Sequence, residues 1–166
     1  MIPDKPMMDR YRWLGLAIGV ALADQGAKHW IAGTFPLGAG ETVLPFFNLV
    51  HILNSGAAFS FLANAGGWQR YVFIALALVV SVGLTIILLK GVANRWEGWG
   101  YSLLLGGAVG NLVDRLVRGA VVDYLDFHAG GWHWPAFNLA DTALCLSAFI
   151  LLLGTLLSSA QSKAPT

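Results

Sequence analysis

Residues 71–89 read YVFIALALVVSVGLTIILL, a stretch without a charged side chain. A helix needs roughly 20 mostly apolar residues to cross the hydrocarbon core of a bilayer. Three other stretches are also long and apolar enough to span, at about residues 13–32, 98–118 and 136–157. We therefore predict an all-α integral membrane protein with four transmembrane helices.

The composition also indicates a membrane protein. Hydrophobic residues make up 57% of the 166-residue chain and charged residues only 11%, whereas charged residues run at about 25% in soluble domains. The length is that of one domain, residues 1–166. A formal net charge of +1 without a cluster of Lys or Arg argues against binding to nucleic acid. Cys145 is the only cysteine, so we expect neither a disulfide nor a cysteine-rich metal site.

Two outer loops connect the predicted helices, at residues 33–70 and 119–135. The first is long for a compact protein, and its segment 41–54 is rich in Val, Phe, Leu and Ile, which predicts one or two short strands. Basic residues concentrate at the opposite ends of the helices, so both termini are expected in the cytoplasm. These basic residues are Lys5, Arg10, Arg12, Lys90, Arg95 and Lys163.

Asp123 and Asp141 lie at the same end of the last two predicted helices. A carboxylate at membrane depth costs on the order of 2.5–3.5 kcal/mol on insertion scales, so it indicates a function. A helical hairpin would bring both to one depth, where two acids can share a proton and perform acid–base chemistry. Each of the two aspartates, considered by itself, could instead have a structural role. Asp141 follows Asn138 at the spacing of a helix cap, and Asp123 could pair with Arg115 or Arg118.

Other polar residues near the outer ends of the helices fall into two groups. Asp24 and Lys28 are four residues apart on one helical face, which favours an internal ion pair over direct catalysis. Asn111, Asp114 and Arg115 share a face of the third helix. The planar guanidinium could hold a carboxylate or a substrate carbonyl, or it could simply pair with a neighbouring aspartate.

Several further residues carry weaker signals. The Gly-x-x-x-Gly spacing within residues 106–110 predicts close helix packing. The four histidines lack the i, i+4 pairing of a zinc-binding helix. We expect no metal and no cofactor, and the roles of Asp126, His128 and His133 stay open.

Two classes other than an enzyme are compatible with intramembrane carboxylates. A proton-coupled transporter or channel also uses them. However, a conduit needs polar residues across the whole bilayer. The inner halves of the predicted helices contain no charged side chain. A non-enzymatic scaffold would use the aspartates only to hold helices together.

Five motifs occur in order along the chain: Asp24-Gln25-x-x-Lys28, Asn54-x-Gly56-Ala57-Ala58-Phe59, Gly106-Gly107-Ala108-x-Gly110-Asn111-x-x-Asp114-Arg115, Val121-Val122-Asp123 and Phe137-Asn138-Leu139-Ala140-Asp141. Together they resemble the motifs of the bacterial lipoprotein signal peptidase (signal peptidase II) family. The resemblance covers nearly the whole chain. One departure is Ala27, where relatives often carry Ser or Thr.

The resemblance implies an aspartyl endopeptidase of the bacterial inner membrane. It would remove signal peptides from prolipoproteins just before a cysteine that carries a diacylglyceryl group. Asp123 and Asp141 match the catalytic pair of the family, near the periplasmic face. The expected partners are such prolipoproteins and membrane lipids, and we expect a monomer. Further residues are expected to bind substrate or support the site: Asn54, Asn111, Arg115, Asn138, Asp24, Lys28 and Asp114.

The hypothesis for the mechanism is a pair of aspartates that share one proton. One takes a proton from water, which attacks the scissile carbonyl, and the other donates a proton to the oxygen and then to the leaving amine. The helix N-terminus at Asn138 favours an ionised Asp141, which we therefore expect to be the base. The sequence leaves open which aspartate holds the proton at rest, the substrate repertoire and the motion of the outer loop.

Overall fold

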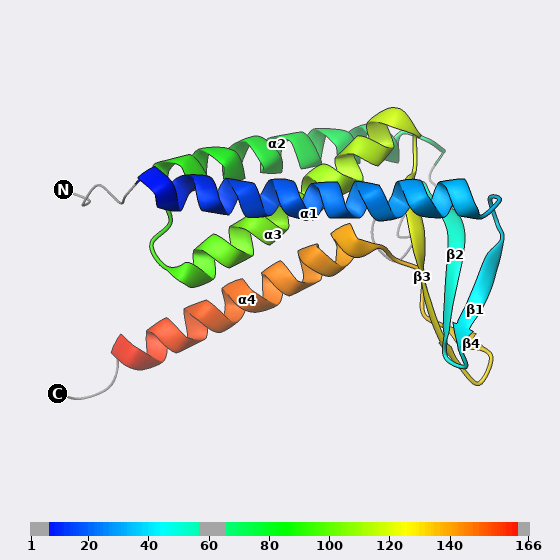
Figure 1. Ribbon diagram of the computed structural model, residues 1–166. Coiled ribbons are helices and arrows are strands. Elements are labelled where there is room, and N and C mark those ends of the chain that lie inside the picture. The colour runs from blue at the N-terminus through cyan, green and yellow to red at the C-terminus, as the bar shows by residue number, and fades with distance from the viewer. Residues whose placement is uncertain (1–6, 57–65, 163–166) are drawn as a thin grey trace.

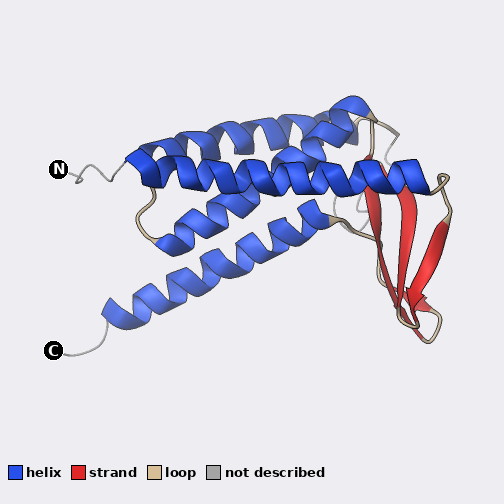
Figure 2. Ribbon diagram, viewed as in Figure 1, coloured by secondary structure: helices blue, strands red, loops and turns tan. Residues whose placement is uncertain are grey.

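The computed structural model describes residues 7–56 and 66–162 (Figure 1). Four helices in this part of the chain run alongside one another, and a small sheet projects from one end of them (Figure 2). The start of the first helix and the end of the last lie at the opposite end. The helices are α1 (Met7–Thr34), α2 (Gln69–Lys90), α3 (Arg95–Val117) and α4 (Leu139–Ser162).

The strands predicted within residues 41–54 are confirmed. The all-α class is corrected, because the sheet also draws on the second outer loop. Its strands are antiparallel in the order β1-β2-β3-β4. Residues 119–135, predicted as a loop, supply two of them. β3 pairs with β2 across a long separation in sequence, a contact that a local sequence pattern does not reveal. The strands are β1 (Gly40–Leu44), β2 (Phe47–Asn54), β3 (Val121–Ala129) and β4 (Trp132–His133).

Two helices of the described chain are long and apolar enough to cross a membrane. They are α2 and residues Leu139–Ser158 of α4, with mean hydropathies of 3.0 and 2.0. α1 and α3 carry charged side chains such as Lys28 and Asp114, which are fully buried inside the bundle. Burial of these charges against one another is what would permit α1 and α3 to cross as well.

α3 is the central helix and packs against α1, α2 and α4. A Cβ atom at Gly106 would lie 2.7 Å from the carbonyl oxygen of Ala17 in α1. A Cβ atom at Gly107 would lie 2.6 Å from the carbonyl oxygen of Ala140 in α4. Glycines therefore set the short distances between α3 and these neighbours, as the Gly-x-x-x-Gly spacing predicts.

The first half of β3 is attached to the helices. Val122 and Tyr124 are buried and pack with Ile31 near the end of α1. Tyr124 also accepts a hydrogen bond at its hydroxyl oxygen from the backbone N–H of Leu139, at 3.2 Å. These contacts fix β3 against both α1 and the start of α4.

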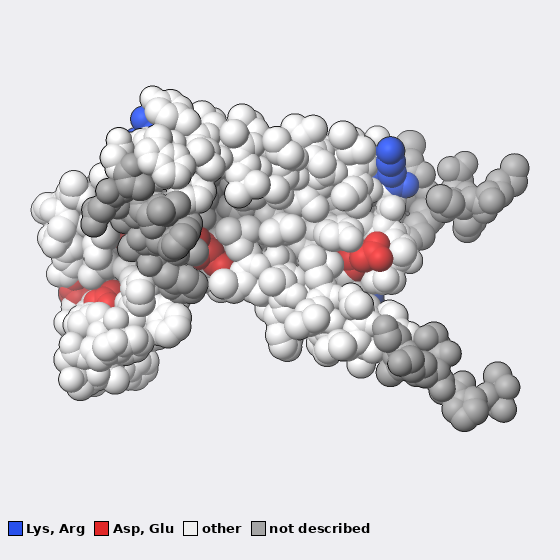
Figure 3. All heavy atoms as spheres, turned by 180° about the vertical axis from the view of Figure 1, so that it is seen from behind, with Lys and Arg blue, Asp and Glu red and all other residues white. Residues whose placement is uncertain are grey.

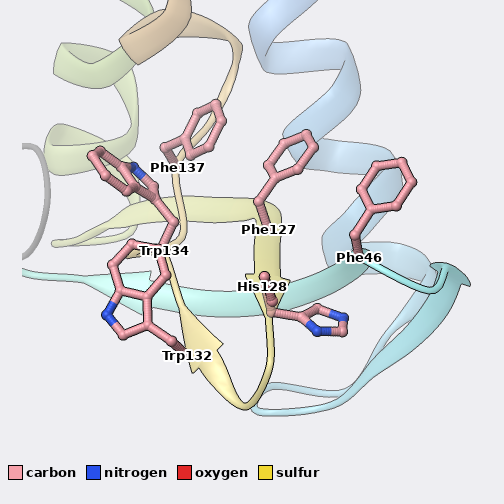
Figure 4. Close-up of a pocket in the computed structure, with 7 residues that line it drawn as sticks. Phe46, Phe127, His128, Trp132, Trp134 and Phe137 are labelled. Carbon is pink, nitrogen blue, oxygen red and sulfur yellow. The ribbon is translucent and has the colours of Figure 1, made fainter.

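The second half of β3 lies in a part of the sheet with two different faces. On one face, the ring of Phe127 lies between those of Phe47 and Phe137, with centroid distances of 4.8 Å to Phe47 and 5.9 Å to Phe137. Phe127 and Phe137 also border an aromatic hollow of about 410 Å³, which Phe46, His128, Trp132 and Trp134 help to line (Figure 4). The opposite face carries polar side chains, because successive residues of a strand point to opposite faces.

Candidate functional site

Asp123 and Asp141 both accept hydrogen bonds from the same residue, Asn138. Asp123 lies in β3, and Asp141 lies in the first turn of α4. Asn138 Nδ2 donates a hydrogen bond to Asp123 Oδ1 at 2.7 Å. The Asn138 backbone N–H donates to Asp141 Oδ2 at 3.3 Å. The two carboxyl groups therefore flank one fully buried asparagine.

Asp141 also has the structural role that its position predicts. Its backbone N–H donates to Asn138 Oδ1 at 2.9 Å, so the two residues form a reciprocal cap at the start of α4. Its other carboxyl oxygen, Oδ1, accepts a hydrogen bond from Asn111 Nδ2 at 2.8 Å. The cap fixes the direction of this side chain without using both of its oxygens.

Asp123 has amide partners in place of the arginines that the sequence suggested. Asn54 Nδ2 donates to Asp123 Oδ2 at 2.9 Å. Arg118 pairs with a different carboxylate, and Arg115 donates to the carbonyl oxygen of Gly56 at 2.7 Å. A neutral amide stabilises a carboxylate less than an arginine does, so it permits protonation more readily.

Burial raises the pKa of Asp123 to about 7. The negative charge of Asp141 adds to the rise, whereas hydrogen bonds from Asn54 and Asn138 and the positive charge of Lys28 oppose it. The carboxyl group therefore exchanges its proton near neutral pH, where an ordinary aspartate is ionised. A group of this kind can serve as a general acid at neutral pH.

Lys28 contacts the residues that hold Asp123 and Asp141 in position. Its ammonium group is fully buried and lies 2.8 Å from Asp24 and 3.2 Å from Asp114. It also donates to Asn111 Oδ1 at 2.8 Å, the residue whose amide nitrogen contacts Asp141. The internal ion pair predicted for α1 is thus part of a larger network.

Asp24 and Asp114 hold the backbone next to the two central aspartates. Asp24 Oδ1 accepts a hydrogen bond from the N–H of Ala140 at 2.9 Å. Asp114 Oδ2 accepts one from the N–H of Val122 at 3.0 Å. Each of these N–H groups belongs to the residue directly before an aspartate of the pair. The buried ionic network therefore controls the position of both carboxyl groups.

A groove along the helices ends at this network. It has a volume of about 330 Å³ and lies between α2, α3 and α4. Its walls are apolar, and its polar residues are Asn111, Arg115 and Asp141. Arg115 also stacks over the ring of Phe73 in α2, with its guanidinium carbon 5.1 Å from the ring centroid. The face shown in Figure 3 is white along the middle of the helices, and its charged side chains lie toward the two ends.

All nine predicted site residues belong to one hydrogen-bonded cluster. Sequence reasoning gave no role to Gln25, whose Nε2 donates to Asp114 Oδ1 at 3.1 Å and to the Gly110 carbonyl at 2.9 Å. It also missed Tyr124, because the contact of its hydroxyl with α4 depends on the unpredicted strand β3. The motif residues 57–59 lie outside the described residues.

No group of three or more His, Cys, Asp or Glu side chains within residues 7–56 and 66–162 could hold a metal ion. Two carboxyl groups held by one asparagine can exchange protons with a bound molecule.

An apolar helical bundle with buried acids and amides gathered at one end, beside a groove, has the features of a membrane enzyme. A family model described as signal peptidase (SPase) II matches residues 16–157. The chain belongs to the signal peptidase II family, and is therefore a protease involved in lipoprotein processing.

Named relatives and solved structures agree with this assignment. The chain is 50% identical over 145 residues to the lipoprotein signal peptidase of Vibrio vulnificus, and the aligned region covers 86% of each protein. It is 44% identical over 154 residues to that of Yersinia enterocolitica, and the aligned region covers 92% of this chain and 91% of that protein. Two solved structures, each described as a bacterial membrane enzyme, align with TM-scores of 0.81 and 0.74 at 29% and 30% identity. They cover 93% and 87% of this chain, and 93% and 92% of their own chains.

Proposed function

We propose that this protein is a membrane aspartyl endopeptidase that cleaves the signal peptide from diacylglyceryl-modified prolipoproteins, directly before the lipidated cysteine. Its relatives' names, lipoprotein signal peptidase, support the substrate class. The observation that carries the aspartyl mechanism is the placement of Asp123 and Asp141 on either side of Asn138, at the end of a groove.

In this proposal all four helices cross the bacterial inner membrane, with both termini in the cytoplasm and the site near the periplasmic face. The basic residues at the cytoplasmic ends of the helices support this orientation. At the tip of the sheet, the exposed side chains of Trp132 and Trp134 suit a position at the membrane–water interface. The enzyme acts as a monomer on substrates that reach it within the bilayer.

The groove between α2 and α4 is the proposed place of the signal peptide. Phe73 and Leu76 of α2 and Leu144 of α4 give it apolar walls, which suit the apolar core of such a peptide. Asp141 and Arg115 lie among its polar residues, and the scissile peptide bond would sit there. The diacylglyceryl chains of the substrate can then stay among the membrane lipids.

The proposed reaction uses a water molecule and one shared proton. Ionised Asp141 takes a proton from water as the water oxygen attacks the scissile carbonyl carbon. Protonated Asp123 gives its proton to the carbonyl oxygen, which forms a tetrahedral diol. When the C–N bond breaks, Asp141 returns its proton to the leaving nitrogen, and Asp123 recovers a proton from a hydroxyl group. Both carboxyl groups end in their starting states.

The proposal is tested with the purified full chain in detergent and a synthetic peptide that contains a diacylglyceryl-cysteine. We expect cleavage on the amino side of that cysteine, identified by mass spectrometry, and no cleavage of the same peptide without the lipid. A metal chelator should leave the rate unchanged, because the proposed chemistry uses no metal. An intact lipidated peptide would count against a peptidase of this specificity.

The alternative of a proton-coupled transporter or channel predicts a different result. The protein in sealed vesicles would then carry protons in response to a pH difference, and the peptide would stay intact. We favour the peptidase because the buried acids cluster at one end of the described helices, next to the sheet. Proton flux that Asp123→Asn abolishes, without peptide cleavage by the wild type, would support the transporter instead.

A further inference from the structure

The tip of the sheet is a tight hairpin between β3 and β4. Its turn, residues 130–131, consists of two glycines with φ angles of 58° and 82°, as a two-residue turn of the hairpin type requires. Ala129 pairs with Trp132, and His128 pairs with His133. Two histidines five residues apart in sequence are therefore direct neighbours on one face of the sheet.

The imidazole rings of this pair are close and nearly parallel. Their centroids are 4.9 Å apart, with 23° between the ring planes. The neighbouring pair is closed by a hydrogen bond from the Trp134 N–H to the Phe127 carbonyl oxygen at 2.8 Å. His128 and His133 thus occupy a position between hydrogen-bonded pairs, where the side chains of antiparallel strands lie closest.

A carboxylate fixes the orientation of the His133 ring. His133 Nδ1 lies 2.9 and 3.0 Å from the two carboxyl oxygens of Asp126. Asp126 in turn accepts a hydrogen bond from Asn48 Nδ2 at 2.8 Å, and Asn48 Oδ1 accepts one from the Thr42 hydroxyl at 2.9 Å. With its proton on Nδ1, the neutral ring presents the lone pair of Nε2. Carboxylates orient metal-binding histidines in this way in many metal sites.

The ring of His128 has a nitrogen that lacks a hydrogen-bond partner in the described structure. This atom, Nε2, is buried, and an unpaired buried polar atom is unfavourable. His133 is about half exposed, with 54% of its side chain accessible, so an ion can approach the pair from water. The two rings therefore offer a buried nitrogen of His128 next to the half-exposed ring of His133.

We propose that His128 and His133 bind one divalent transition-metal ion of the zinc and copper class, and that Asp126 positions His133 for this role. Imidazole nitrogen suits these ions, and a metal–nitrogen bond of about 2.0–2.1 Å places two such nitrogens roughly 3 Å apart. The ring centroids already lie 4.9 Å apart, and binding requires the two nitrogens to turn toward each other. Water occupies the remaining coordination positions, because the described chain supplies no third ligand.

This site is separate from the proposed peptidase site. Asp126 and Asp123 are an odd number of residues apart in β3, so their side chains lie on opposite faces of the sheet. Figure 4 shows His128 pointing away from the aromatic side chain of Phe127, its neighbour in the strand. Metal binding can therefore be measured without reference to peptide cleavage.

The test is a Cu²⁺ titration of the full chain, purified in detergent without a histidine tag and followed by electron paramagnetic resonance. We expect one bound ion and a nitrogen coupling pattern from two imidazoles. His128→Phe and His133→Phe should each weaken binding by about tenfold or more, and Asp126→Asn by about 10–100-fold. Zn²⁺ should displace the copper. His29→Phe, which removes a histidine of α1, should leave the affinity unchanged.

The spectrum of the wild type gives a readout that does not depend on the folding of any variant. Bound copper with fewer than two imidazole nitrogens would overturn the proposal. So would equal affinity of the wild type and the double variant His128→Phe/His133→Phe, or no binding below about 1 mM Cu²⁺. Unchanged affinity in Asp126→Asn, with circular dichroism like that of the wild type, would remove the positioning role of Asp126.

Discussion

Asp123 and Asp126 lie in the same strand, and both are almost inaccessible to solvent, with exposed fractions of 2% and 6%. Their pKa values nevertheless move in opposite directions. Burial raises the pKa of Asp123 to about 7, and the charge of Asp141 adds to this rise. Burial also acts to raise the pKa of Asp126, but hydrogen bonds from Asn48 and His133 outweigh it, so the pKa falls below its ordinary value.

Partners, rather than burial alone, therefore decide which aspartate can carry a proton at neutral pH. Asp123 faces the helices, where its neighbours are two amides and another carboxyl group. Asp126 faces the other side of the sheet, where Asn48 and His133 hydrogen-bond to its carboxyl group. The strand therefore carries an aspartate with a raised pKa on one face and an aspartate with a lowered pKa on the other.

The contrast between Asp123 and Asp126 is tested most directly by removing each charge in turn. Asp123→Asn should lower kcat of peptide cleavage by about 10²–10⁴-fold, the usual contribution of a general acid or base. Asp141→Asn should have an effect of similar size. Asp126→Asn should leave kcat within about twofold, because its side chain lies on the opposite face of β3. Initial rates with the diacylglyceryl-cysteine peptide measure all three.

The three asparagine variants keep the size of the side chain, so thermal unfolding in detergent can identify any that misfold. Full activity in a well-folded Asp123→Asn variant would remove the proposed general acid. A loss in Asp126→Asn as large as that in Asp123→Asn would show that the two faces of the strand do not differ in function.

The second comparison concerns two cations that bind the same carboxylate. Lys28 is fully buried and contacts Asp114 from the inside of the bundle, whereas Arg118 contacts it from the edge with 26% of its side chain exposed. Lys28→Met leaves Asp24 and Asp114 without this charge and should destabilise the protein by about 3–5 kcal/mol. Arg118→Met should cost about 1 kcal/mol or less, as partly exposed ion pairs usually do.

Thermal unfolding of the two methionine variants in the same detergent gives this difference. Because Lys28 holds the residues that position both aspartates, Lys28→Met should also lose peptidase activity at temperatures where it stays folded. Equal melting temperatures for the two variants would contradict the central place of Lys28 in the network.

The sequence predicted the polar cluster better than it predicted the sheet. Charges in apolar segments are costly, so Asp24, Lys28 and Asp141 stood out from local sequence alone, and one network unites them. Strand β3 could not be predicted in this way. Its partner β2 lies far away in the chain, and the pattern of Val121–Ala129 resembles a polar loop because it contains two aspartates and a histidine.

The role of Asn54 shows the same limit. Nothing local distinguishes this residue from any asparagine at the end of a strand, and only the resemblance to the family indicated it. Its contact with Asp123 depends on the pairing of β2 with β3, where Asn54 lies opposite Val121. The histidine pair of the hairpin was missed for a related reason, since a search for helical spacing does not find partners across a strand turn.

The third comparison concerns two helical glycines, one against a neighbouring helix and one in open space. A Cβ atom at Gly107 would come 2.6 Å from the Ala140 carbonyl oxygen, whereas a Cβ atom at Gly83 of α2 would meet nothing within 4 Å. Gly107→Ala should therefore cost about 1–3 kcal/mol through overpacking. Gly83→Ala should raise stability by about 0.5–1 kcal/mol. Thermal unfolding of both variants gives the signs, and equal signs would contradict the packing described for α3.

The smallest expected effect comes from two asparagines of β2 that contact the two aspartates of β3. Asn54 donates to Asp123 and lowers its pKa, while Asn48 donates to Asp126. If Asp123 is the acid, activity falls as the pH rises through its pKa of about 7. Asn54→Ala removes a hydrogen bond that favours the ionised form, so this fall should move to higher pH.

Asn48→Ala is the matched control, because it changes the same strand on the other face of the sheet. Its pH profile of kcat should keep the fall where the wild type has it, near pH 7. A shift to lower pH in Asn54→Ala would contradict the assignment of Asp123 as the proton donor, since removal of that hydrogen bond can only favour the protonated form. Equal shifts in both variants would mean that the two faces of β3 are electrostatically coupled, and that the contrast between Asp123 and Asp126 does not depend on their separate partners.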